Sequence, residues 1–228
     1  MTDGFEYFVG QLSTIDDAGL SKPSALPGWT RRHVVSHVGF NARAAGRLVR
    51  WVRTGEVTPM YPDTSARARE IEEGAHWSGQ RLRELVQREQ AALASALRDL
   101  DDSDWSFEVV TAQGRTVQAG EIPWLRTREL WIHAVDLDAG GDFHDLPPDM
   151  IDRLVAEAVQ KRRAGDSPGL DVRLTDRNPG GTPVGSGDGP TPVVEGAAAD
   201  IARWLTRREP RGVRTSDGTP LPELGPWL

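Results

Sequence analysis

The chain has 228 residues with 38% hydrophobic content, enough to bury the core of one large domain or two small ones. Its formal net charge is −7, so we expect no nonspecific attraction to nucleic acid or to anionic lipid. The absence of cysteine excludes disulfides, cysteine-rich zinc sites and a cysteine nucleophile, so any thiol chemistry needs an external thiol.

No segment of the sequence predicts a membrane span or an export signal. No apolar run approaches the roughly 20 residues that cross a bilayer. The first residues, MTDGFEYFVG, lack the basic and apolar regions of a signal peptide. We therefore expect a cytoplasmic protein, and the net charge gives no reason to expect association beyond a monomer.

The first two thirds of the chain predict helices. Apolar residues at three- and four-residue steps indicate a first helix over residues 3–20. Thr30 is a favourable N-cap for a second helix that runs to about Trp51. A third, charged helix is expected over residues 66–99, where leucines mark one buried stripe.

A β-hairpin and a fourth helix follow. The segment FEVVTAQGRTVQA has two β-branched runs around a turn at Gln113 and Gly114. Pro123 lies early enough to open a helix that runs to about Asp138. Four helices that each have an apolar face predict a four-helix bundle, which we assign to a domain at residues 1–143.

The composition changes at GGDFHDLPP, where a second pattern begins. Beyond it we expect a helix over residues 148–163, a strand in LDVRLTD, a Gly- and Pro-rich stretch NPGGTPVGSGDGPTP, a strand in PVVEG and a helix over residues 197–208. Short strands that alternate with helices predict a small α+β domain at residues 144–228. The fold class of the whole chain is therefore expected to be α+β.

Glu129 and His133 are four residues apart on the fourth expected helix, so they lie on one face of it. Such a pair is common as a simple hydrogen-bonded pair on a helix surface. This face also carries Leu125 and Ile132, which a bundle would bury, and a buried carboxylate needs a partner. We infer that this partner is a metal ion. With a second imidazole from elsewhere in the chain, the carboxylate and two imidazoles would leave one tetrahedral position open, as catalytic zinc sites do.

His37 is the best candidate for the second imidazole. His33 lies in the first turn of its helix beside two arginines, whereas His37 stands between Val34 and Val38. Asp136 is either an acceptor that orients a ligand imidazole or a plain polar residue near the helix end. Spacing alone does not distinguish zinc from iron or manganese, since these ions also bind imidazole and carboxylate.

Four strings carry a resemblance to a known family by their order and spacing: LPGWTRRHVVSHVGFNA, TGEVTPMY, VVTAQGRTVQA and RELWIHAVDLD. The chain resembles the mycothiol-dependent maleylpyruvate isomerases of actinobacteria, and the similarity extends to the C-terminal PWL. The resemblance implies a DinB-like metal-binding bundle followed by the small α+β domain. It also implies a zinc ion held by His37, Glu129 and His133, with water at the open position.

The activity that the resemblance implies is the conversion of maleylpyruvate, a small dicarboxylate, to fumarylpyruvate in gentisate breakdown, with mycothiol as cofactor. Coordination to zinc deprotonates a thiol that is mostly protonated at neutral pH. The thiolate adds to the cis double bond, the resulting single bond rotates, and elimination gives the trans product.

Such a reaction calls for a cation that binds the substrate carboxylates and the enolate. By resemblance, Arg208 in the cluster RREPRGVR corresponds to the active-site arginine of the family. The alternative is a solvated basic helix end, where arginine interacts favourably with the helix dipole. Arg67 is a further candidate for anchoring the substrate.

Two other functions stay open. A zinc- and mycothiol-dependent S-transferase would use the same groups on electrophiles but would leave a thiol adduct as product. A non-enzymatic zinc-binding stress module would need neither the thiol nor an open coordination position, because purely structural zinc sites are closed.

Overall fold

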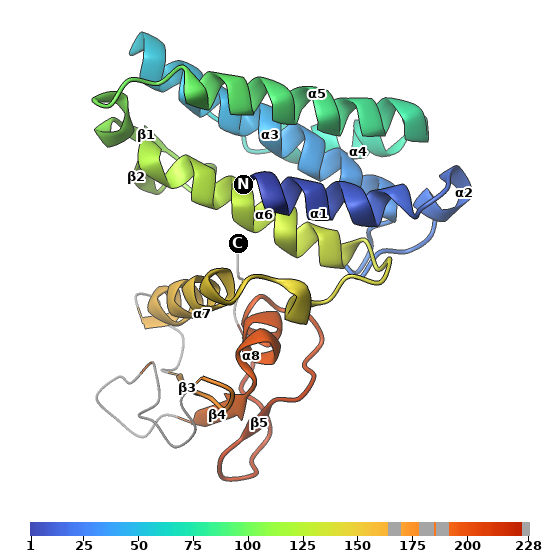
Figure 1. Cartoon of the computed structure of the whole chain (residues 1–228), viewed down its shortest axis with the longest axis vertical. Helices are drawn as coiled ribbons and strands as arrows, with labels where there is room; N and C mark the ends of the chain where they lie inside the picture. The colour runs from blue at the N-terminus through green and yellow to red at the C-terminus, as the bar shows by residue number, and fades with distance from the viewer. Residues whose placement is uncertain (164–169, 178–184, 186–191, 225–228) are drawn as a thin grey trace. The chain divides into compact units, whose positions relative to one another are not determined.

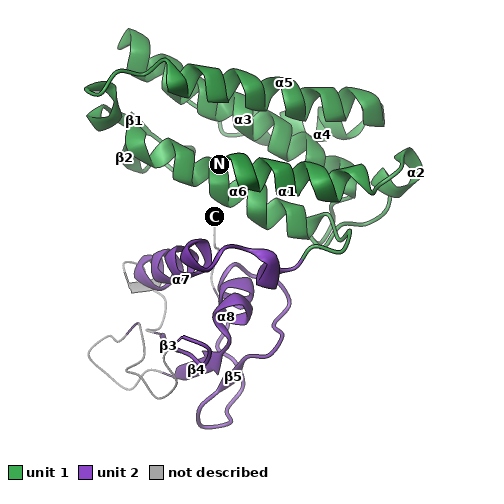
Figure 2. Ribbon diagram, in the orientation of Figure 1, with its two compact units in different colours: residues 1–141 green, residues 142–228 purple. Residues whose placement is uncertain are grey.

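The computed structural model describes residues 1–163, 170–177, 185 and 192–224 (Figure 1). The chain forms two compact units, unit 1 at Met1–Gly141 and unit 2 at Asp142–Leu228 (Figure 2). Unit 1 is mainly helical and unit 2 combines helices with a small sheet, so the expected α+β class is confirmed. Most of the expected Gly- and Pro-rich stretch and the C-terminal PWL lie outside the described residues.

Unit 1 is built around four long helices. Helix α3 contacts both α5 and α6, and α1 packs on α6, which completes the expected four-helix bundle (Figure 1). The short α4 lies against α3. The helices of unit 1 are α1 (Thr2–Ser13), α2 (Asp17–Leu20), α3 (Arg31–Thr54), α4 (Ala66–Ala75), α5 (Gly79–Arg98) and α6 (Ile122–Asp136).

Two of the expected helices are each divided in the structure, so the prediction of one continuous helix was wrong at both places. The first helix divides into α1 and α2, because the Asp16 side chain accepts a hydrogen bond from Gly19 N at 2.6 Å and caps α2. The third divides into α4 and α5, because Ser78 Oγ accepts from Arg81 N at 3.3 Å and caps α5. Both residue types favour caps over helix interiors, since their side chains bond to nearby backbone groups.

The ends of α3 follow from local chemistry. Thr30 is its N-cap, as predicted, and Thr30 N donates to His33 Nδ1 at 3.2 Å. The ring of His33 is thereby held at the start of the helix. Gly55 ends the helix with φ of 68°, a left-handed conformation that glycine adopts without strain.

Two clusters of buried apolar residues stabilise unit 1. The first joins α1, α3, α5 and α6 and includes Phe8, Val38 and Leu130. The second lies toward the other end of α3 and α5 and includes Val109 and Val117. These two valines are paired in the expected hairpin of β1 (Glu108–Val110) and β2 (Thr116–Gln118), so the hairpin prediction is confirmed. Short 3-10 helices flank the hairpin at Asp104–Ser106 and Ala119–Glu121.

Helix α3 approaches α5 closely at Gly39. A Cβ atom on this residue would lie 2.6 Å from Leu85 Cδ2. Leu85 is fully buried, so its side chain has no free space to move into. The glycine therefore sets how near α3 and α5 pack, two residues after His37.

The described residues of unit 2 form a three-stranded sheet with the order β3-β4-β5. The central β4 pairs in parallel with β3 and antiparallel with β5, and α8 contacts both α7 and the strands. The short β5 was not expected from the sequence. The elements of unit 2 are η3 (Phe143–Asp145), α7 (Pro148–Arg163), β3 (Asp171–Leu174), β4 (Val193–Gly196), α8 (Ala198–Leu205) and β5 (Arg214–Thr215).

No helix in the described ranges has the length and apolar character that crossing a bilayer requires.

Candidate metal centre

The structure brings together the three donors that the sequence singles out. His37 comes from α3, and Glu129 and His133 come from α6. One ligand atom from each residue lies within 4.8 Å of the other two. His37 Nε2 is 2.8 Å from Glu129 Oε2, and His133 Nε2 is 3.2 Å from the same oxygen. The two imidazole rings stand nearly perpendicular, at 88°.

The donors lie in the interior of the bundle. The side chain of Glu129 is 11% exposed, and His37 and His133 are 2% and 8% exposed. Burial raises the pKa of the Glu129 carboxyl, but hydrogen bonds from His133 and His37 outweigh it and hold this pKa well below its ordinary value. Glu129 is therefore an anion enclosed between two imidazoles.

The two histidines differ in their protonation chemistry. Burial lowers the pKa of His37 to about 4, although the hydrogen bond to Glu129 opposes this shift. His37 is therefore neutral at pH 7, which is the form that binds a metal ion. Burial also lowers the pKa of His133, but hydrogen bonds to Asp136 and Glu129 outweigh it and raise the pKa above its ordinary value.

Asp136 supports His133 from the side away from Glu129. Its Oδ2 is 2.8 Å from His133 Nδ1, and Asp136 is fully buried. Histidines that bind metals usually donate the other ring N–H to such an acceptor, which fixes the ring and its tautomer. The arrangement of the two carboxylates around His133 thus favours a cation at the centre, and the donor set suits a divalent metal with an open position.

Sequence reasoning missed Arg126, a fully buried guanidinium about one helical turn before Glu129. Arg126 Nε donates to Gln90 Oε1 at 2.9 Å, and Nη1 donates to Val38 O at 2.9 Å and to Asn41 Oδ1 at 2.8 Å. Burial lowers its pKa to about 10, while the charge of Glu129 opposes the shift. The sequence did offer one indication of this role, since Arg126 and Glu129 are three residues apart and therefore lie on the same face of the helix.

A second group of polar side chains lies near the donors and includes Tyr61 and Arg67. Burial raises the pKa of Tyr61 to about 12. The negative charge of Glu129 also raises this pKa, whereas the positive charge of Arg67 opposes the shift. Its phenol therefore stays protonated at pH 7. Arg67, from α4, places Nη2 3.5 Å from His37 Nδ1 and is exposed.

Arg208, the predicted catalytic residue, lies in unit 2 just after α8. It is half-buried, and its Nη1 donates to Thr206 O at 2.6 Å. The preceding residue, Arg207, has φ of 66°, so the chain turns sharply at the point where the predicted helix was expected to continue. The helix ends at Leu205 instead. The catalytic role of Arg208 stays a prediction.

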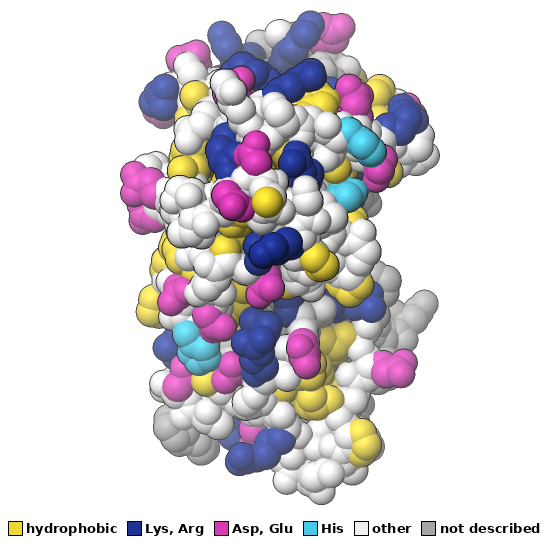
Figure 3. Space-filling view, turned by 90° about the vertical axis from the view of Figure 1, so that its right-hand side faces the viewer, with side chains coloured by type: hydrophobic (Ala, Val, Ile, Leu, Met, Phe, Trp, Pro, Cys, Tyr) yellow, Lys and Arg dark blue, Asp and Glu magenta, His cyan; other side chains and the backbone are white. Residues whose placement is uncertain are grey.

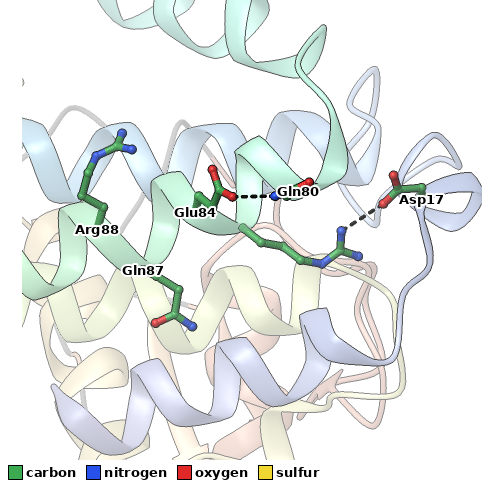
Figure 4. A pocket seen from close by; sticks show the side chains of 6 residues that line it. Asp17, Gln80, Glu84, Gln87 and Arg88 are labelled. Atoms are coloured by element: carbon green, nitrogen blue, oxygen red, sulfur yellow. Dashed lines mark hydrogen bonds and ion pairs between the residues drawn. The ribbon is translucent and has the colours of Figure 1, made fainter.

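A surface pocket elsewhere on unit 1 contains none of the donors. It is lined by side chains of α5 and by Asp17 (Figure 4). Arg83 bonds to Asp17 at 3.0 Å and Gln80 to Glu84 at 2.8 Å, so these groups satisfy one another. On the face shown in Figure 3, acidic and basic side chains are interspersed.

The comparisons with known proteins agree with one another. Residues 2–138 match the family described as "Mycothiol maleylpyruvate isomerase N-terminal domain". The crystal structure of a mycothiol-dependent maleylpyruvate isomerase is similar to this chain, with 41% identity, a TM-score of 0.91, and coverage of 98% of this chain and 92% of that chain. A histidine-to-alanine mutant of a protein so described matches with the same values. A search of curated proteins finds no match.

Proposed function

The chain belongs to the mycothiol maleylpyruvate isomerase family, and we propose that it isomerises maleylpyruvate to fumarylpyruvate with mycothiol as its thiol. The protein is an isomerase. The observation that carries this proposal is the 41% identity to the crystallised isomerase over 98% of the chain. The buried donor set of His37, Glu129 and His133 agrees with it.

We assign a zinc ion to these three donors. When bound, zinc lowers the pKa of a coordinated thiol, so that a thiolate forms near neutral pH. His37 offers a neutral imidazole, and Glu129 offers an ionised carboxylate. Asp136 holds the ring of His133 in one orientation. Three protein ligands leave a position free for an external group.

An external thiol explains how a chain without cysteine can catalyse this isomerisation. Reversible addition of a thiol to the cis double bond gives it temporary single-bond character, and elimination returns the thiol unchanged. Buried Arg126 places a positive charge about one turn from Glu129 and partly balances the negative charge of the site. Its hydrogen bonds to α3 and α5 keep it in place.

Arg208 is the proposed catalytic cation. A guanidinium binds carboxylates with two parallel hydrogen bonds and stabilises negative charge that develops on an enolate. Its half-buried position leaves part of the side chain accessible to a ligand. We propose that it contacts the substrate during the reaction.

The experiment that tests the proposed function is incubation of the zinc-loaded protein with mycothiol and maleylpyruvate. We expect quantitative fumarylpyruvate and no consumption of thiol, measured by chromatography and by thiol titration. Accumulation of a stable thiol adduct would instead identify an S-transferase. No change in maleylpyruvate or thiol would identify a non-enzymatic zinc-binding module.

The remaining assignments rest on the resemblance and on the sequence. We propose that the reaction serves gentisate breakdown in an actinobacterium, and that the protein acts as a monomer in the cytoplasm, where low-molecular-weight thiols stay reduced. We propose a metal-binding domain at residues 1–143 and a second domain at residues 144–228.

A further inference from the structure

The two histidines of the metal centre differ at the ring nitrogen that faces away from Glu129. In His133 this nitrogen, Nδ1, lies 2.8 Å from the carboxylate of Asp136. In His37 the polar atom beside Nδ1 is Arg67 Nη2, at 3.5 Å. Within residues 1–163, 170–177, 185 and 192–224, no carboxylate or carbonyl accepts a hydrogen bond from His37 Nδ1.

This contact becomes unfavourable when His37 binds a metal ion through Nε2. A neutral imidazole that binds through one nitrogen carries its proton on the other, so His37 Nδ1 is then a donor. A guanidinium has five N–H donors and no acceptor. Two donors therefore face each other, and the pair needs an external acceptor. A carboxylate can supply one oxygen to each of them.

Arg67 also differs from the other arginines around it. Arg69, on the same helix, is 2.8 Å from Asp63, and Arg47 on α3 is 3.2 Å from Glu70. Among the residues that the structure describes, Arg67 has no carboxylate within 4.0 Å. It is exposed, so an anion that arrives from solvent can reach it.

We propose that Arg67 and the Nδ1–H of His37 together bind one carboxylate of the substrate. Arg67 is then a specificity-determining residue that selects substrates with a carboxylate at this position. The identity of that substrate rests on the proposed function, whereas carboxylate binding at this place does not. The absent acceptor beside His37 would be provided by the substrate, as Asp136 provides it beside His133.

The first test measures the binding of maleate to the zinc-loaded protein by calorimetry, with no thiol present. We expect Arg67→Gln to weaken binding roughly 10- to 100-fold, because a hydrogen bond to a charged group is lost. Arg69→Gln is the matched control, since it removes an exposed arginine of the same helix that already pairs with Asp63, and its affinity should equal that of the wild type. Equal affinities in both variants would overturn the proposal.

The second test observes the two histidines directly. In zinc-loaded protein with ¹⁵N-labelled histidine, addition of maleate should shift the Nδ1–H resonance of His37 and leave that of His133 in place. The resonance of His133 is the internal reference because Asp136 already accepts its proton. A His37 resonance that does not move at saturating maleate also overturns the proposal.

Turnover measurements separate this inference from the proposed function. With maleylpyruvate and mycothiol, Arg67→Gln should raise KM by at least about tenfold and change kcat little, with the zinc content unchanged. An unchanged KM would reject the role of Arg67 and leave the isomerase function intact. Maleate binding that depends on Arg67, in a protein that does not isomerise maleylpyruvate, would reject the isomerase function alone.

Discussion

At the scale of single residues, the metal centre depends on two helices that are far apart in the sequence. His37 and Glu129 are separated by 92 positions, yet their side chains meet at 2.8 Å. Glu129 and His133 are adjacent by virtue of their helical spacing. The site thus combines one contact that local geometry supplies and one that only the folded bundle supplies.

Removal of a donor should abolish metal binding. We expect His37→Ala and His133→Ala to contain less than stoichiometric zinc, measured by elemental mass spectrometry after dialysis, because two ligands hold the ion much more weakly than three. His33→Ala is a suitable control, since His33 pairs with Thr30 at the helix start and lies outside the donor set. Full zinc content in both donor variants would disprove the site.

Replacement of Arg208 should affect turnover and leave the metal in place. We expect Arg208→Ala to reduce kcat/KM about 100- to 1,000-fold, the usual effect of losing one contact to charge that develops in the transition state. Arg211→Ala, in the same basic segment, should retain activity because Arg211 is exposed and lies 3.9 Å from Asp142. Unchanged kcat/KM in Arg208→Ala would rule out a catalytic role.

The sequence was informative about the donors and less so about their surroundings. Helical spacing and an apolar face bring Glu129 and His133 forward as candidates, since both follow from local geometry, and the family resemblance makes the choice specific. The sequence did not predict the buried position of Arg126, because a lone arginine within a helix is usually solvated. The hydrogen bonds of Arg126 to Gln90 and Asn41 depend on tertiary packing.

At the scale of elements, the predicted helices were correct in position and two were wrong in continuity. The leucines that mark the stripe of residues 66–99 all lie after Ser78, so the stripe supports the helix from there on and does not show whether it continues from the preceding residues. The division depends on whether one side chain caps the backbone, a small free-energy difference that tertiary packing decides. Strand β5 has only two residues and depends on pairing with β4, which short sequence patterns do not report.

The close approach of α3 and α5 predicts that alanine substitutions at two glycines of α3 change the stability of the protein in opposite directions. Gly39→Ala should destabilise the protein by about 1–3 kcal/mol, because the added methyl group would overlap the buried side chain of Leu85. Gly46→Ala should stabilise it by about 0.5–1 kcal/mol, since nothing beyond the adjoining turns of its own helix lies within 4 Å of the added group and alanine favours the helix. Urea unfolding monitored by circular dichroism would measure both, and equal effects would contradict the packing argument.

At the scale of the whole molecule, unit 1 contains everything that the metal centre needs. Both apolar clusters and all three donors belong to Met1–Gly141, whereas Arg208 belongs to unit 2. The proposed metal ligands and the proposed carboxylate site at Arg67 and His37 therefore all lie in unit 1, whereas the proposed catalytic cation lies in unit 2.

A fragment of residues 1–141 should fold and bind one zinc ion without catalysing isomerisation. The apolar clusters that stabilise the bundle are complete in this fragment, and the donors are present. Circular dichroism, zinc analysis and the maleylpyruvate assay would test the three parts of this prediction, with the full chain as control. A helical fragment that fails to bind zinc would show that unit 2 contributes to the metal site.

The separation of His37 from Glu129 along the chain also bears on how the protein matures. In small zinc modules the ligands are close in sequence, and the ion organises an otherwise unfolded chain. Here the ligands meet only after α3 and α6 have packed, so the ion is expected to arrive after the bundle has formed. Newly synthesised protein would then persist as a folded, inactive reserve, and its activation would follow the supply of zinc in the cell.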